Sequence, residues 1–220
     1  MKGRIFMNQK TRKLTTIAML AAMAYILMLV GRIPIVLFLK YDPKDVIITI
    51  GGFVFGPLTS FLISLIVSLV EMFTVSETGI IGCIMNLIST CAFACTAAFV
   101  YKKKHTIKGA VLGLVLGVLI MTGIMLLWNW LITPLYMGVQ REEVVKLLLP
   151  AFLPFNVLKG VLNTSITLIL YKPIVNALRH MGFIERKEQT KRPGKIGIAL
   201  VATLVLVTCI FIILVWKGII

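Results

Sequence analysis

The stretch that decides the fold is Ala110–Ile132, which reads AVLGLVLGVLIMTGIMLLWNWLI. It contains no charged residue over its whole length. A helix needs about 20 predominantly apolar residues to cross a bilayer. The stretch is therefore predicted to be a membrane-spanning helix.

The rest of the chain repeats this pattern. Six further apolar stretches alternate with short charged connections: Leu14–Val30, Val46–Phe55, Leu58–Phe73, Ile80–Tyr101, Phe152–Tyr171 and Ile196–Trp216. Val46–Phe55 is too short to span alone, so we expect a half-length or tilted element joined to the next stretch through a break at Gly56-Pro57. Hydrophobic residues make up 59% of the chain and the mean hydropathy is +1.01, which a soluble protein of this size could not bury. The sequence predicts an all-α integral membrane protein and excludes a water-soluble enzyme.

The charged connections predict the orientation in the membrane. If the N-terminus is cytoplasmic, 16 of the 23 Lys and Arg residues lie inside and six of the eight acidic residues lie outside. This asymmetry is the one that the positive-inside rule describes, and it places the C-terminus outside. The net charge of +15 is then explained by topology and by attraction to anionic lipid headgroups, and nucleic-acid binding is the weaker explanation.

These patterns divide the chain into four parts. We expect a basic cytoplasmic N-terminus at 1–13, a six-helix membrane domain at 14–180, a basic cytoplasmic linker at 181–195 and an additional membrane helix at 196–216. The first apolar stretch has the basic start of a secretory signal, and Ala22-Met23-Ala24 is similar to a cleavage site. Its apolar residues nevertheless continue to Val30, which favours a retained helix.

Several motifs of chemistry are missing from the sequence. It contains no G-x-x-x-x-G-K-[ST] phosphate loop, so active transport by this chain would take its energy from a partner. His105 and His180 lie in basic cytoplasmic segments, and no nucleophile–base pair or paired carboxylates are visible. All four cysteines lie in predicted spans, which indicates buried thiols and neither a disulfide framework nor a metal site.

Small residues mark two helix faces where close approach is expected. Ala18 and Ala22 form an A-x-x-x-A face on the first span, and Gly109, Gly113 and Gly117 form a double G-x-x-x-G on the fifth. Ordinary packing within the molecule is the favoured interpretation for the glycines. For the alanines, internal packing and docking of another membrane protein remain equal alternatives.

Polar residues collect near the predicted outer surface. Lys40-Tyr-Asp-Pro-Lys-Asp45 directly precedes an apolar helix, and Asp45 is placed to cap or electrostatically favour its N-terminus. A solvated loop with an N-cap is the plain alternative. At the outer end of the fifth span, Trp128, Trp130 and Tyr136 are typical of an interfacial belt. Asn129 differs from them, because its amide needs hydrogen-bond partners near the hydrocarbon.

A third polar group opens the sixth span. Asn156 and Lys159 are three residues apart and share one helix face. A lysine at this depth must snorkel, pair or meet a ligand. Asn86 on the fourth span could also face the interior, with an interhelical hydrogen bond as the equal alternative. Together these residues predict an outward-facing pocket that suits a flat, uncharged, hydrogen-bonding heterocycle.

Four runs carry a resemblance to a known family: LKYDPKD (39–45), GGFVFGP (51–57), NWLITPLY (129–136) and PFNVLKG (154–160). They resemble the riboflavin-specific substrate-binding components, or S-components, of energy-coupling factor (ECF) vitamin transporters. The resemblance covers about residues 10–180, and it implies a six-helix protein that binds riboflavin from outside, while binding of FMN as well stays open. It further implies delivery inward with a transmembrane T-component and two ATPases.

The resemblance also implies roles for residues at matching motif positions. Asn129, Asn156 and Lys159 would hydrogen-bond the flavin under a Lys40–Asp45 loop, while Ala18 and Ala22 would meet the T-component. Members of the family usually end after six helices, so Ile196–Trp216 departs from the pattern and is expected to be an anchor or a packing helix. Two other functions stay open: an S-component for a different small vitamin or precursor, and a membrane scaffold or sensor that transports nothing.

Overall fold

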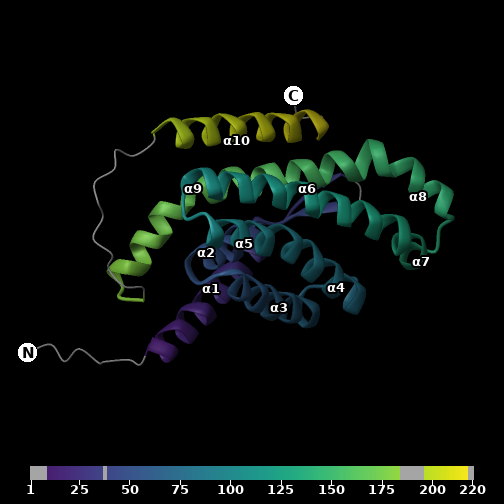
Figure 1. Ribbon diagram of the computed structural model, residues 1–220. Coiled ribbons are helices and arrows are strands. Elements are labelled where there is room, and N and C mark those ends of the chain that lie inside the picture. The colour runs from purple at the N-terminus through teal and green to yellow at the C-terminus, as the bar shows by residue number, and fades with distance from the viewer. Residues whose placement is uncertain (1–8, 37–38, 184–195, 218–220) are drawn as a thin grey trace, which may run out of the picture.

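Long apolar helices build nearly all of the structure (Figure 1). A computed structural model describes residues 9–36, 39–183 and 196–217. Its helices are α1 (Gln9–Gly31), α2 (Lys44–Phe55), α3 (Pro57–Thr74), α4 (Gly79–Thr90), α5 (Thr96–Lys103), α6 (Ile107–Leu131), α7 (Thr133–Met137), α8 (Arg141–Leu147), α9 (Leu153–His180) and α10 (Ile196–Trp216). Within the described residues, six helical segments are long and apolar enough to cross a membrane. The predicted all-α membrane fold is confirmed.

The break predicted at Gly56-Pro57 separates α2 from α3. Gly56 has φ +97°, a backbone conformation that L side chains rarely adopt, and Pro57 begins α3 where its missing N–H costs nothing. The 12 residues of α2 are too few to cross a bilayer upright. This helix is the half-length element that the sequence indicated.

Two of the predicted spans are longer and less regular than their apolar stretches. A π-helical turn, η1 (Cys91–Cys95), joins α4 to α5, and a second, η2 (Leu148–Phe152), joins α8 to α9. The sixth span was predicted at Phe152–Tyr171, but the helical segment runs from Arg141 to His180. The prediction was too short because apolar content marks the part of a helix that suits lipid, whereas helical hydrogen bonding continues into the polar ends.

A small β-hairpin follows α1, which the sequence did not predict. Strand β1 (Ile33–Val36) pairs antiparallel with β2 (Leu39–Tyr41), with Ile33 opposite Tyr41. The segment predicted as a Lys40–Asp45 loop is therefore the end of β2, a turn at Asp42-Pro43 and the first turn of α2. Strands of three and four residues are too short for an alternating pattern to be recognised.

The glycine face of α6 packs inside the molecule, as predicted. A Cβ atom on Gly113 would lie 2.7 Å from the carbonyl oxygen of Ala97, and one on Gly117 would lie 2.7 Å from that of Phe93. The absent side chains therefore let α6 approach the backbone of α5 and η1 directly.

Replacement of Gly117 by alanine is expected to lower the free energy of unfolding by about 1–3 kcal/mol, because backbone atoms must move to admit the methyl group. The matched control is Gly123→Ala on the same helix, where a Cβ meets nothing within 4 Å. Thermal unfolding in detergent compares the two variants. Equal stability of the two proteins would contradict the packing role of Gly117.

The first and last helices lie on opposite sides of the bundle (Figure 1). The α10 helix runs along α9 and contacts it extensively. On α1, Ile17, Leu20, Ala21 and Ala24 are buried in the core, whereas Ala18 and Ala22 are exposed. The A-x-x-x-A face thus has no packing role among the described residues.

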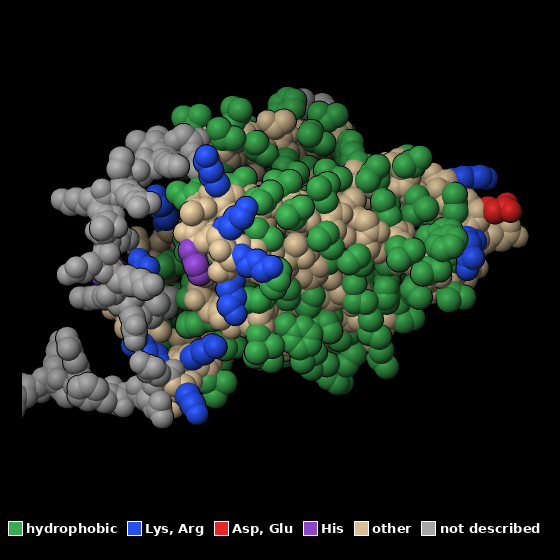
Figure 2. All heavy atoms as spheres, in the orientation of Figure 1, with side chains coloured by type: hydrophobic (Ala, Val, Ile, Leu, Met, Phe, Trp, Pro, Cys, Tyr) green, Lys and Arg blue, Asp and Glu red, His purple; other side chains and the backbone are tan. Residues whose placement is uncertain are grey.

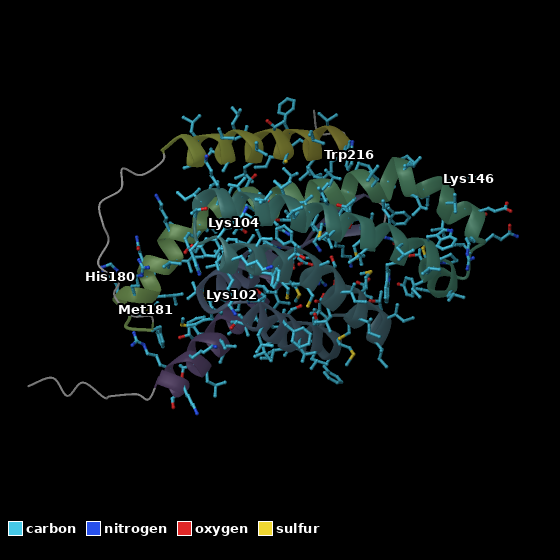
Figure 3. All side chains as sticks on the ribbon, viewed as in Figure 1. Lys102, Lys104, Lys146, His180, Met181 and Trp216 are labelled. Atoms are coloured by element: carbon cyan, nitrogen blue, oxygen red, sulfur yellow. The ribbon has the colours of Figure 1, made fainter. Side chains whose placement is uncertain are left out.

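The two ends of the bundle differ in charge. Lys and Arg side chains gather at the end where α1 begins and α9 finishes, which we call the basic end (Figure 2). Lys102, Lys104 and His180 lie toward this end, while Lys146 of α8 lies at the far end (Figure 3). We call that far end the cavity end, because it contains the site described next.

Candidate functional site

A cavity of about 190 Å³ opens at the cavity end. It lies between the hairpin, the C-terminal end of α3, α4, the end of α6, α7 and the start of α9. Seven of the eight residues predicted to bind substrate line it: Lys40, Asn86, Trp128, Asn129, Tyr136, Asn156 and Lys159. The structure therefore gathers side chains from five separate segments around one space.

The two asparagines predicted to read a ligand are buried in the cavity wall. Asn129 donates a hydrogen bond to the Met125 carbonyl oxygen at 2.7 Å and accepts one from the Thr133 hydroxyl at 2.9 Å. Asn156 donates to the Phe152 carbonyl oxygen at 2.8 Å. Each amide has two N–H donors, so these bonds orient the side chain and leave further hydrogen-bonding capacity for a ligand.

Lys159 lies deep in the wall and does not snorkel. Its side chain is only 8% exposed, and Nζ lies 3.6 Å from Oδ2 of Asp45. Because a buried cation without a partner is very costly, this carboxylate is what permits a lysine at this position. The sequence left pairing, snorkelling and ligand contact open for Lys159, and the structure shows pairing.

Asp45 is the predicted substrate-binding residue that does not line the cavity. It is fully buried behind Lys159, where it accepts hydrogen bonds from the Thr90 hydroxyl at 2.6 Å and from Asn163 Nδ2 at 3.2 Å. The proposed capping role is wrong, because the N-cap of α2 is Pro43 and no side chain caps it. The alternative of a solvated loop is also wrong. Asp45 stays within the first turn, where its charge favours the helix N-terminus.

A second charged group was missed at the level of the sequence, and three of its members, Arg32, Asp42 and Glu71, line the cavity. Lys44 Nζ donates to Glu71 Oε2 at 2.5 Å, and Arg32 also pairs with Glu71. Oδ2 of Asp42 lies 3.9 Å from Nη2 of Arg32 and also 3.9 Å from Nζ of Lys44. Glu71 is the single charged residue of the stretch Leu58–Phe73, and an acid inside a span is a signal that could have pointed to this group.

Six charged side chains at the cavity balance, five of them buried and Arg32 partly exposed. Arg32, Lys44 and Lys159 face Asp42, Asp45 and Glu71, three cations against three anions. Burial raises the pKa of Asp42, but the nearby Lys44, Lys159 and Arg32 outweigh it and hold the pKa below its ordinary value. The Asp42 carboxylate therefore stays ionised, and three cations against three anions leave no net charge from these groups in the wall.

The rim of the cavity is aromatic and partly open. Trp128 of α6 and Tyr136 of α7 lie on one side of it. Lys40 lies on the hairpin side, where its Nζ is 3.0 Å from Oε1 of Glu77. Within the described residues, no group of three or more His, Cys, Asp or Glu side chains could hold a metal ion. The arrangement can bind a neutral ligand by stacking at the rim and by hydrogen bonds to amides and Lys159 inside.

Comparison with known proteins agrees with this picture. A sequence model of the family "ECF transporter, substrate-specific component" matches residues 12–171. The riboflavin transporter FmnP of Bacillus subtilis is 30% identical over 186 residues, which cover 77% of this chain and 97% of that protein. The riboflavin transporter RibU of Staphylococcus aureus is 27% identical over 82% of this chain and 100% of its own length.

A solved structure, that of the S component of a bacterial ECF transporter, is also similar. The likeness has a TM-score of 0.66 with 26% sequence identity, and it covers 77% of this chain and 99% of that one. The α10 helix lies beyond the residues that the family model matches.

Proposed function

This chain belongs to the family of substrate-specific components of ECF transporters, and on that premise we propose that it captures riboflavin from outside the cell and delivers it to the cytoplasm. It is a multi-pass membrane protein and a transporter subunit, not an enzyme. The named riboflavin transporters among its relatives support this ligand.

The observation that carries the proposal is the charge-balanced cavity with Asn129, Asn156 and Lys159 in its wall. The isoalloxazine ring of riboflavin is flat and uncharged, and one edge carries carbonyl oxygens and a ring N–H. Lysine and amide donors match the carbonyls, an amide oxygen matches the N–H, and Trp128 and Tyr136 offer aromatic faces.

The size of the cavity indicates how the ligand reaches it. About 190 Å³ is less than the roughly 300–1,000 Å³ of typical ligand pockets. Leu39 and Lys40 of the hairpin form one wall. We infer that the hairpin moves outward to admit a three-ring ligand and closes over it afterwards.

The partners follow from what the chain offers and what it lacks. Its sequence contains no phosphate loop, so two ATPase subunits would supply the energy. The exposed Ala18 and Ala22 on α1 form a small-residue face on which a T-component could pack closely. The basic end would lie in the cytoplasm with the N-terminus, and the cavity end outside with the C-terminus.

Riboflavin fluorescence quenching tests the proposal with the full chain purified in detergent. Wild type is expected to quench tightly, whereas Asn156→Ala and Lys159→Met are expected to weaken binding at least about tenfold, equivalent to about 1.4 kcal/mol. Lys146→Ala is the matched control, because this exposed lysine lies on α8 away from the cavity lining.

The outcomes separate the alternatives. No quenching by a folded wild-type protein would overturn riboflavin as the ligand and leave another small vitamin or a scaffold role. Competition with FMN shows whether a phosphate is tolerated beside the buried carboxylates. Equal affinity of wild type and Lys159→Met would place the flavin elsewhere.

A further inference from the structure

The last helix, α10, meets the rest of the protein along a single stripe. Ala202 and Cys209 are buried and Val205, Leu206 and Ile213 are partly buried, and these five recur at the three- and four-residue spacing of one helix face, with the partly buried Leu214 beside it. Most of its other large side chains are exposed, as expected for lipid contact. The two buried residues of the stripe, Ala202 and Cys209, have small side chains, and small residues are typical of membrane helix interfaces.

This stripe packs on the hairpin as well as on α9. Cys209 belongs to one apolar cluster with Ile35 of β1, Tyr41 of β2 and Leu158 of α9. The α10 helix also contacts strand β1 directly. The hairpin is therefore held between the last helix and the bundle, at the strands whose Leu39 and Lys40 line the cavity.

Tyr41 connects this cluster to the charged wall of the cavity. Its hydroxyl donates to Asn163 Oδ1 at 2.9 Å, and Asn163 Nδ2 donates to Asp45 Oδ2 at 3.2 Å. The same Oδ2 atom lies 3.6 Å from Lys159 Nζ. Burial, with the carboxylates of Asp45 and Asp42, raises the pKa of Tyr41 far above its ordinary value, so its hydroxyl stays a donor.

We propose that α10 is a working part of the binding unit: it braces the hairpin in its closed position and, through Tyr41, Asn163 and Asp45, fixes Lys159 where the ligand meets it. Tyr41 and Asn163 are positioning residues, because neither lines the cavity. This inference rests on the proposed function for its ligand.

Two consequences follow from the geometry. If the hairpin must move to admit the ligand, the contacts of α10 with β1 and Tyr41 add to the free energy of opening and slow ligand release. Because α10 lies on the far side of the bundle from α1, it can move together with the other helices and leave Ala18 and Ala22 free (Figure 1).

Two neighbouring tryptophan substitutions in the full chain test the brace. Cys209→Trp places a large ring in the stripe that faces α9 and the hairpin, whereas Ile210→Trp places it on a residue that is 46% exposed. Cys209→Trp is expected to speed amide hydrogen exchange of the hairpin strands, measured without ligand, at least about tenfold and to speed riboflavin release about fivefold. Ile210→Trp should stay within twofold of wild type in both measurements.

A double-mutant cycle tests the connection to Lys159. Tyr41→Phe removes one hydroxyl and is expected to weaken riboflavin binding about fivefold in wild type but less than twofold in Lys159→Met. Additive losses would show that Tyr41 acts independently of Lys159 and would overturn the positioning role. A merely structural tyrosine would give such additivity.

The two proposals fail in different ways. If wild type binds no riboflavin, the proposed ligand is wrong, and the ligand-free exchange measurement still decides the brace. If wild type binds riboflavin, and the two tryptophan variants show equal rates of hairpin amide exchange and of riboflavin release, α10 is only an anchor and the inference is wrong.

Discussion

Replacement of Glu71 by alanine is expected to lower the free energy of unfolding by about 3–5 kcal/mol, since removal of one partner leaves an uncompensated buried charge. Glu71 is 3% exposed and is the partner of both Arg32 and Lys44. Lys44 is 1% exposed and has no access to bulk water. Loss of the carboxylate leaves Asp42, at 3.9 Å from each cation, as the remaining anion of this group.

Glu77 provides the matched control for this change. It also pairs with a lysine, Lys40, at 3.0 Å, but its side chain is 78% exposed. An exposed ion pair contributes about 0–1 kcal/mol, so Glu77→Ala should unfold close to wild type. Thermal unfolding in detergent without ligand measures both variants. Comparable stability of the two would contradict the buried ion-pair role of Glu71.

The second large effect is expected at Asp45, whose removal should lower both the stability of the protein and its affinity for riboflavin. Asp45→Ala leaves Lys159 buried without its carboxylate and deprives Thr90 and Asn163 of their acceptor. We expect a loss of about 3–5 kcal/mol in the free energy of unfolding. Riboflavin binding should also weaken at least tenfold, because Lys159 loses its fixed position.

A second substitution distinguishes an uncompensated charge from a packing defect. In Asp45→Ala with Lys159→Met, no cation remains to be neutralised, so a substantial part of the lost stability should return, although riboflavin affinity should not. Unfolding and fluorescence quenching on the same samples give both readouts. A double variant that is less stable than Asp45→Ala alone would show that charge compensation is not what Asp45 contributes.

The sequence predicted most of the residues that line the candidate site, but it missed the ion pairs and hydrogen bonds that hold them. Asn129, Asn156 and Lys159 stand out in the sequence because polar groups are rare in apolar stretches, and all three line the cavity. The sequence predicted that Asp45 caps or electrostatically favours the N-terminus of a helix and that it binds substrate, and it gave no sign of the partners that bury this carboxylate. Its partners are distant in the chain, with Asn163 separated from it by 118 residues, and no local pattern contains that information.

The sequence by itself determined the membrane class, the apolar spans, the break at Gly56-Pro57 and the close-packed glycine face of α6. Each of these depends on neighbouring residues alone, either on how a segment partitions into lipid or on which backbone conformations it allows. Only the tertiary structure decided that Lys44 pairs with Glu71, that Lys159 pairs with Asp45, that a hairpin forms one wall of the cavity and that α10 packs on α9. A buried charge needs a counter-charge, and the hydropathy of the sequence shows only that burying the charge costs free energy. Which residue supplies the counter-charge depends on which distant helices pack together in three dimensions.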